Sequence, residues 1–254
     1  MILTVDIGNT NIAIGGFLKD QLAFVARICT DTTKTADEYA DKILGILRLY
    51  KIESDLVEGA IIASVVPPLT VVLKDALKVA YGVDAEIVSC ERDCKMQLLC
   101  DQPSTVGADI ICACVAAKYV YGYPSLIVDM GTATKMMVID KNGDFIGVSI
   151  MPGVLMGLKA LSSNTAQLPQ VSLEAPLSVI GKNTADCMKS GAVYGNACMV
   201  DGMIDRFNEE YGKKLNVYAT GGLAPYIVKH LKHEVTLDEN LVLKGLNLLY
   251  SKNS

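Results

Sequence analysis

The chain has 254 residues, enough for one large domain or for two domains of about 120 residues each. Hydrophobic residues make up 51% of the sequence and charged residues 20%, which is typical of a compact globular protein and not of a disordered one. The net charge of −5 disfavours nucleic acids and anionic membranes as partners, because both prefer a basic protein face.

The first half of the chain predicts three strands followed by alternating helices and strands. Tyr39, Ile43 and Leu47 recur at helical spacing and indicate an amphipathic helix. Pro67 and Pro103 each mark the start of a helix, since proline is tolerated in a first turn. The expected strands are 1–5, 12–17, 21–28, 59–66 and 85–89, and the expected helices are 36–52, 67–81 and 103–120.

The second half repeats this order of elements. A hairpin turn at 141–144 corresponds to the turn at Lys19 and Asp20 in the first half. The expected strands are 125–128, 135–140, 145–150 and 216–219, and the expected helices are 153–162 and 183–211, followed by two closing helices. Three strands followed by alternating helices and strands predict an α/β layer fold.

The two halves share a motif as well as an order of elements. Aligning Asp6 on Asp129 places Gly8 on Gly131, with Asn9 on Thr132 and Asn11 on Thr134 in the same register. Agreement of motif, strand lengths and turn position predicts an internal duplication. We therefore expect two similar domains, residues 1–120 and 121–254, with a cleft between them.

The duplicated D-x-G-[TN] loops suggest a nucleotide site. Glycine lets the backbone approach a ligand, and the neighbouring threonine and asparagine side chains are donors that suit phosphate oxygens. The carboxylate would hold a metal ion or a water bound to one. The chain contains neither a G-x-x-x-x-G-K-[ST] nor a G-x-G motif, which excludes the P-loop and Rossmann interpretations. An alternative is that both loops are ordinary hairpin turns with a side-chain-bonded aspartate.

Neither the N-terminus nor the cysteines suggest export. The opening apolar run reaches Asp6 after five residues, and the longest charge-free stretch, 59–73, contains two prolines. The eight cysteines form no C-x-x-C motif, and we expect reduced thiols in a soluble cytoplasmic protein. A metal site of Cys90, Cys94 and Cys100 with the two histidines matches no zinc spacing.

Paired D-x-G-[TN] loops resemble those of the actin, hexokinase and Hsp70 ATPase superfamily, in which two ribonuclease-H-like domains enclose ATP. Within that superfamily, nine segments resemble the type III pantothenate kinases, in the family's order across nearly the whole chain. They are V-D-I-G-N-T-N at 5–11, S-V-V-P at 64–67, P-S-T-V-G-A-D at 103–109, D-M-G-T-A-T at 129–134, I-M-P-G at 150–153, T-A-Q-L-P at 165–169, G-K-N-T at 181–184, S-G-x-x-Y-G at 190–195 and T-G-G-L-A at 220–224.

The resemblance implies an ATP site with two metal ions. Asp6 would lie near a magnesium ion and hold it through water, and Asp129 would bind a potassium or ammonium ion. The residues that match the family's ATP-binding positions are Asp6, Gly8, Asn9, Thr10 and Asn11 in the first phosphate loop, Gly131 and Thr132 in the second, and Gly221 and Gly222 in the adenosine-side loop.

The resemblance also implies a site for pantothenate. Gly107, Ala108 and Asp109 match the substrate motif, in which the aspartate is the catalytic base. Thr184 matches a threonine that reaches the pantothenate site of the neighbouring subunit in the family's homodimer. From the residues alone, an aspartate beside the apolar run at 110–114 needs a helix N-terminus or a ligand hydroxyl. The alternative role of Asp109 is simply to stabilise the first turn of a helix.

Three positions depart from the family's pattern. Ile110 stands where the family usually has arginine, Cys100 where it commonly has tyrosine, and Lys135 where it has threonine. Loss of an arginine fork could cost about 1.5–3 kcal/mol of binding. Ile110 and Cys100 therefore predict weakened, altered or absent use of pantothenate, unless Lys135 or another cation compensates.

Three functions are compatible with these features. The first is ATP-dependent phosphorylation of pantothenate to 4'-phosphopantothenate, which begins coenzyme A biosynthesis. The second is phosphorylation of another small hydroxyl compound by a divergent paralogue. The third is a non-catalytic ATP-binding module with a regulatory role.

Overall fold

The computed structural model describes residues 1–90, 94 and 96–251. The chain forms two compact units, one of Met1–Tyr121 with the closing helix α8 (Leu241–Ser251) and one of Gly122–Asn240. The sequence places the domain boundary between residues 120 and 121, and it assigns the closing helix to the second half. Among the described residues, no helix combines the length and apolar character needed to span a membrane.

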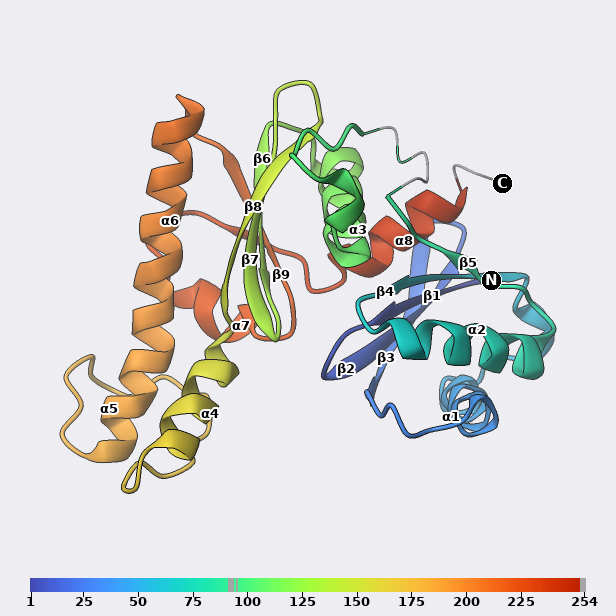
Figure 1. The fold of residues 1–254 in the computed structure, drawn as a ribbon, viewed down its shortest axis with the longest axis horizontal. Helices are drawn as coiled ribbons and strands as arrows, with labels where there is room; N and C mark the ends of the chain where they lie inside the picture. The colour runs from blue at the N-terminus through green and yellow to red at the C-terminus, as the bar shows by residue number, and fades with distance from the viewer. Residues whose placement is uncertain (91–93, 95, 252–254) are drawn as a thin grey trace. The chain divides into compact units, whose positions relative to one another are not determined.

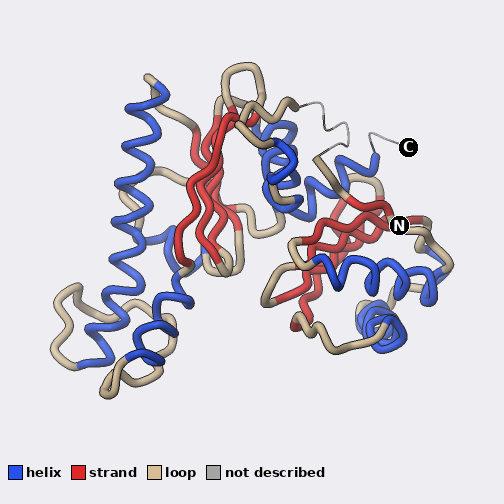
Figure 2. Tube along the Cα trace, viewed as in Figure 1, coloured by secondary structure: helices blue, strands red, loops and turns tan. Residues whose placement is uncertain are grey.

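The first unit is built on a five-stranded mixed sheet with the order β3-β2-β1-β4-β5 (Figures 1 and 2). The strands β1, β2 and β3 form an antiparallel meander, whereas β4 and β5 continue the sheet parallel to β1. The strand bounds are Ile2–Ile7 (β1), Asn11–Leu18 (β2), Gln21–Cys29 (β3), Gly59–Ser64 (β4) and Glu86–Ile87 (β5).

Local sequence signals fix the two helices that follow the meander. Helix α1 (Ala36–Leu49) begins with a capping box between Thr35 and Glu38, which satisfies backbone donors at its first turn. Helix α2 (Pro67–Tyr81) starts with proline in its first turn and ends at Gly82, which adopts the left-handed conformation. The short 3-10 turn η1 (Ser54–Leu56) precedes β4.

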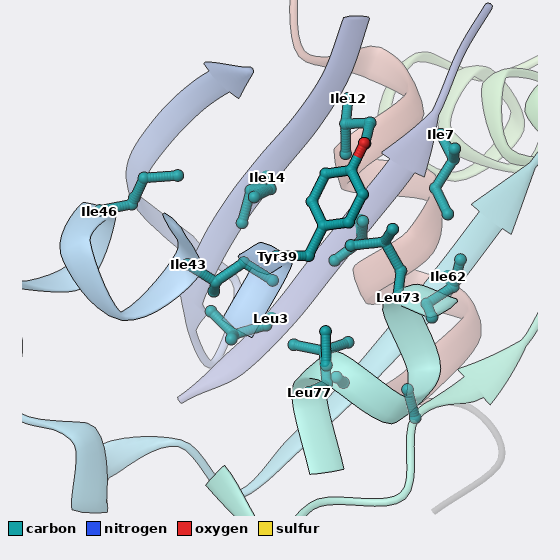
Figure 3. Packing of buried hydrophobic residues seen from close by; sticks show 14 of the residues in the cluster. Leu3, Ile7, Ile12, Ile14, Tyr39, Ile43, Ile46, Ile62, Leu73 and Leu77 are labelled. Carbon is teal, nitrogen blue, oxygen red and sulfur yellow. The ribbon is translucent and has the colours of Figure 1, made fainter. Parts of the chain in front are cut away.

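One face of this sheet packs against α1 and α2. Tyr39 lies at the centre of the packed cluster, among aliphatic side chains of the strands and both helices (Figure 3). Its ring is buried, and its hydroxyl donates to the carbonyl oxygen of Asp31 at 2.9 Å. Leu3, Ile43 and Leu73 are fully buried in the same cluster. The alternating inward residues of β1 thus hold the strand that carries Asp6.

Helix α8 packs against α3 (Ala108–Ala116) in the same unit. The two helices approach closely at Gly245, where an added Cβ would lie 1.9 Å from the carbonyl oxygen of Cys112. The 3-10 turn η2 (Pro103–Thr105) precedes α3, and the π-helical segment η3 (Ala117–Tyr121) follows it. Glycine at 245 is therefore a packing requirement of this unit.

We expect Gly245→Ala to lower the thermal unfolding midpoint of the protein by several degrees. The methyl group would push α8 away from α3, and overpacking of this kind costs about 1–3 kcal/mol. Gly45→Ala is the matched control in α1, since its Cβ would meet no atom within 4 Å. The control should be neutral or stabilising, because alanine is the better helix former. Equal midpoints for the two variants would contradict the close contact.

The second unit repeats the topology of the first. Its sheet has the order β10-β9-β6-β7-β8, and β6, β7 and β8 form the antiparallel meander while β9 and β10 continue parallel to β6. The strand bounds are Ser125–Met130 (β6), Ala133–Ile139 (β7), Phe145–Pro152 (β8), Asn216–Thr220 (β9) and Thr236–Leu237 (β10). The helices are α4 (Val154–Asn164), α5 (Thr184–Ser190), α6 (Asn196–Tyr211) and α7 (Ala224–Ile227). The same strand order in both units confirms the predicted α/β duplication.

Several element bounds differ from the sequence prediction. The helix expected at 103–120 is divided among η2, α3 and η3, because Gly107 is the N-cap of α3. The helix expected at 183–211 contains the π-helical segment η4 (Gly191–Gly195) between α5 and α6. The short strand β10 was not expected from the sequence, and the turn η5 (Val228–His230) lies before it.

The gapless alignment of the two loops is wrong by one residue. Asp6 pairs with Ala13 across β1 and β2, whereas Asp129 pairs with Lys135 across β6 and β7. The second loop is therefore one residue shorter, and Asn11 corresponds in register to Ala133 and not to Thr134. This difference decides which side chain faces Asp129.

Candidate functional site

The first glycine loop connects β1 to β2. The amide of Gly8 donates to the carbonyl oxygen of Asn11 at 3.0 Å and closes the turn. A Cβ on Gly8 would lie 3.0 Å from that oxygen, so glycine suits this position. Asn9, Thr10 and Asn11 are exposed. The loop thus exposes a run of short polar residues.

Thr30 supports the first loop from the end of β3. Its hydroxyl donates to the carbonyl oxygen of Gly8 at 2.6 Å, and its amide donates to the carbonyl oxygen of Thr10 at 3.0 Å. Two bonds from one residue hold the loop at both of its ends. The sequence alone does not point to Thr30, since its only signal is its place directly after the third predicted strand.

The second glycine loop connects β6 to β7. The amide of Gly131 donates to the carbonyl oxygen of Ala133 at 3.0 Å, as Gly8 does in the first loop. Gly153, the N-cap of α4, lies against this loop and donates its amide to the carbonyl oxygen of Thr132 at 3.1 Å. A Cβ on Gly153 would meet the Thr132 and Gly131 oxygens at 2.3 and 2.5 Å. Gly153 therefore fixes the position of the loop, a role that the I-M-P-G segment alone did not reveal.

The structure brings the Gly221 loop to the same end of the second sheet. Thr220 pairs with Asp129 between the parallel strands β9 and β6, and the amide of Leu223 donates to the carbonyl oxygen of Met130 at 3.0 Å. Gly221 has a φ of +93°, and a Cβ there would lie 2.6 Å from Asp129 Oδ1. Gly222 is exposed, and its Cβ position is open. Asp129, Gly131 and Gly221 thus lie together in the second unit.

Asp129 is largely buried and forms an ion pair with Lys135. The Lys135 Nζ lies 2.7 Å from Asp129 Oδ2. The carboxylate at which the family resemblance implies a potassium or ammonium ion therefore already has a positive charge beside it. The sequence marks Lys135 by its departure from the family pattern, but it does not predict this pairing.

Asp109 lies in the first turn of α3, as the sequence suggests. Its Oδ1 accepts a hydrogen bond from the amide of Ile110 at 2.8 Å. A Cβ on Gly107 would lie 2.6 Å from the same oxygen, so the glycine leaves room for the carboxylate. The helix N-terminus favours the negative charge.

The first unit also brings Asp109 and Asp6 toward one another. Burial raises the pKa of the Cys112 thiol well above its ordinary value, and the negative charges of Asp6 and Asp109 raise it further. Val65 contacts the two elements that carry these carboxylates: its amide donates to the carbonyl oxygen of Ile7 at 3.0 Å, and its Cγ1 lies 3.8 Å from the Cβ position of Gly107. The carboxylate of the first glycine loop and the predicted base thus share one region of the first unit.

The remaining predicted substrate residues have different environments. Ala108 and Ile110 are buried, whereas Cys100 is half-buried at a bend before η2. Thr184 is exposed at the start of α5 in the second unit, directly after the N-cap Asn183. The structure thus brings Gly107 to Ile110 together on α3, and it places Thr184 in the other unit.

The oxygen donors at the first loop fit a divalent metal ion whose other ligands are water and phosphate oxygens. In the parts of the chain that the structure describes, no group of three or more His, Cys, Asp or Glu side chains is arranged for a metal ion. Asp6 lies in β1, and the oxygen-bearing side chains of Asn9, Thr10 and Asn11 follow it in the chain. One carboxylate with phosphate and water oxygens is the donor set that magnesium prefers.

Comparison with known proteins relates the chain to one enzyme family. A sequence model of that family, described as Type III pantothenate kinase, matches residues 2–206. A type III pantothenate kinase of Exiguobacterium sp. is 39% identical over 253 residues, which cover 100% of this chain and 99% of the relative. The enzyme of Moorella thermoacetica is 37% identical over 254 residues, with 100% of both chains covered.

A solved structure gives independent support for the fold. The activator of the 2-hydroxyisocaproyl-CoA dehydratase from Clostridium difficile, with bound ADPNP, has a TM-score of 0.57 to this chain. The sequence identity is 13%, and the match covers 99% of this chain and 94% of that one. At this identity the likeness concerns the fold alone, which agrees with two units of the same strand order.

Proposed function

Because this chain belongs to the type III pantothenate kinase family, we propose that Asp109 is its catalytic base and that its glycine loops bind ATP. The protein phosphorylates pantothenate to 4'-phosphopantothenate with ATP, which is the first step of coenzyme A biosynthesis. The observation that carries the proposed site is the contact of Val65 with both elements: its amide donates to the carbonyl oxygen of Ile7, next to Asp6, at 3.0 Å, and its Cγ1 lies 3.8 Å from the Cβ position of Gly107, the N-cap of the helix that carries Asp109. We propose a cytoplasmic location, as expected for a metabolic enzyme.

Asp109 is suited to orient and deprotonate a hydroxyl group. In the proposed reaction the primary hydroxyl oxygen of pantothenate bonds to the γ-phosphorus of ATP, the bond from that phosphorus to the β-γ bridging oxygen breaks, and ADP leaves. The hydroxyl proton passes to an Asp109 carboxylate oxygen. Because phosphoryl transfer has a loose transition state, orientation of the hydroxyl is the larger part of this role.

The two phosphate loops supply backbone and side-chain donors. The Gly8 and Gly131 amides close their own turns, so we assign to phosphate oxygens the amides of Asn9, Thr10 and Thr132 and the side chains of Asn9, Thr10, Asn11 and Thr132. We assign Gly221 and Gly222 to the adenosine side. ATP-dependent kinases use a divalent metal ion, and we propose magnesium, held near Asp6 through water. Such an ion neutralises phosphate charge when bound. Thr30 keeps the first loop in position for it.

We expect Ile110 and Cys100 to weaken or alter the binding of pantothenate. The Ile110 side chain is buried and offers no hydrogen bond to a carboxylate. A second candidate substrate is therefore another small hydroxyl compound with a less polar body. Competition between pantothenate and an uncharged amide derivative of it would reveal this preference.

We propose that the enzyme is a homodimer. The segment before α5 exposes large apolar side chains at Leu177, Val179 and Ile180, and Thr184 is exposed close by. Apolar side chains gathered in one exposed segment suit burial against a second copy. We expect Ile180→Glu to convert dimer into monomer in sedimentation measurements and to raise the KM for pantothenate. An unchanged dimer would contradict this interface.

ADP release measured with and without pantothenate tests the proposed function. Pantothenate-stimulated release, with phosphate found on the substrate by mass spectrometry, supports it. Binding of ATP without any release would favour the regulatory module. Release stimulated by another hydroxyl compound and not by pantothenate would favour the divergent kinase.

A further inference from the structure

The ion pair of Asp129 and Lys135 is built into the second sheet. The two residues face each other across β6 and β7, and their side chains are only 12% and 14% exposed. A carboxylate withdrawn from water is unstable without a counter-charge or hydrogen bonds. The chain supplies that charge from its own sequence, 2.7 Å from the carboxylate oxygen.

This ion pair adjoins the two nucleotide loops of the second unit. Asp129 Oδ1 lies 3.7 Å from the Cβ position of Gly131 and 2.6 Å from that of Gly221. An uncompensated carboxylate at this place would repel phosphate groups bound by the loop of Gly131 and Thr132. The Lys135 ammonium removes this repulsion, and it does so without an ion from solution.

The equivalent carboxylate of the first unit has a different neighbour. Asp6 faces Ala13 across β1 and β2, in the same register position that Lys135 holds relative to Asp129. An alanine side chain carries no charge. The two units therefore differ at this register position, where only the second has a lysine on the adjacent strand.

We propose that the Lys135 ammonium takes the place of a dissociable monovalent cation at Asp129, so that the enzyme needs neither potassium nor ammonium ions. A lysine ammonium is a compact monocation with three N–H donors, and it brings the single positive charge that a potassium ion would bring. This inference rests on the proposed kinase function where ADP release is the measurement. The thermal unfolding midpoint is a second measurement that does not depend on that function.

The test compares the wild type with Lys135→Thr in potassium, ammonium, sodium and choline chloride at one ionic strength. ADP release with pantothenate and the thermal unfolding midpoint are measured in each salt. We expect the wild type to have the same rate of ADP release and the same unfolding midpoint in all four salts. An ion that does not bind the native state does not shift its stability. In choline chloride, Lys135→Thr should lose at least about tenfold in ADP release and roughly 5–15 °C in unfolding midpoint. Potassium or ammonium should restore both properties.

Lys189→Thr is the matched control. The Lys189 side chain is 17% exposed and also forms an ion pair, but its partner Glu174 is 62% exposed, so water can solvate that carboxylate. This variant should show no dependence on the kind of cation. A potassium-specific gain in the wild type would overturn the proposal, as would a Lys135→Thr variant that is equally impaired in all four salts. If the wild type releases no ADP in any salt, the kinase function fails, and the unfolding midpoints still decide the cation inference.

Discussion

Replacing Asp109 with asparagine should lower the rate of pantothenate-dependent ADP release by about 10²–10⁴-fold and leave ATP binding intact. Asparagine has nearly the same shape, and its side-chain oxygen can keep the hydrogen bond from the amide of Ile110. It cannot accept the hydroxyl proton of the substrate. Steady-state kinetics and calorimetric titration with ATP separate the two effects.

Asp37→Asn is a matched control for the loss of helix-dipole stabilisation. Asp37 follows Ala36 at the start of α1, as Asp109 follows Ala108 at the start of α3, but it is exposed. Removing either carboxylate costs about 0.3–1 kcal/mol of helix stability. If Asp109 only stabilises its helix, both variants will be fully active. Turnover near the wild-type rate in Asp109→Asn would therefore reject its assignment as the base.

Elements fixed by local chemistry were predictable from the sequence. Helix α2 has a proline in its first turn and a glycine after its last residue, so both ends are encoded within the helix and its immediate neighbours. The two meanders were recognisable because their strands alternate and their turns recur at equivalent places. The D-x-G-[TN] motifs indicated the loops for the same reason, since a tight turn needs its glycine at a fixed position.

Features that depend on distant residues were not predictable in the same way. Thr30 bonds to Gly8 across 22 positions of sequence, and helix α8 packs with the first unit although it ends the chain. The ion pair depends on the length of the second loop. With a loop as long as the first, Asp129 would face Met136, whereas the observed register places Lys135 opposite it. A single deleted residue in a loop leaves no periodicity signal, so the alignment of the motifs alone could not reveal the pairing.

Gly153→Ala should displace the second phosphate loop and reduce kcat/KM for ATP by about 10²-fold. The backbone at Gly153 has a φ of −70° and a ψ of 158°, which alanine adopts without strain. The expected effect therefore comes from the added methyl group, which would lie 2.3 Å from the Thr132 oxygen and 2.5 Å from the Gly131 oxygen. Both contacts are with backbone, so relief requires movement of the loop that we assign to ATP phosphates.

Gly157→Ala, one turn further along α4, separates loop displacement from any general effect of alanine in this helix. Its Cβ would have no neighbour within 4 Å, and alanine is favoured over glycine in a helix by about 1 kcal/mol. This control should keep its ATP affinity and gain slightly in unfolding midpoint. If Gly153→Ala also keeps its affinity for ATP, then Gly131 and Thr132 do not hold the phosphates, because a loop moved by the methyl group cannot preserve contacts made through its own backbone.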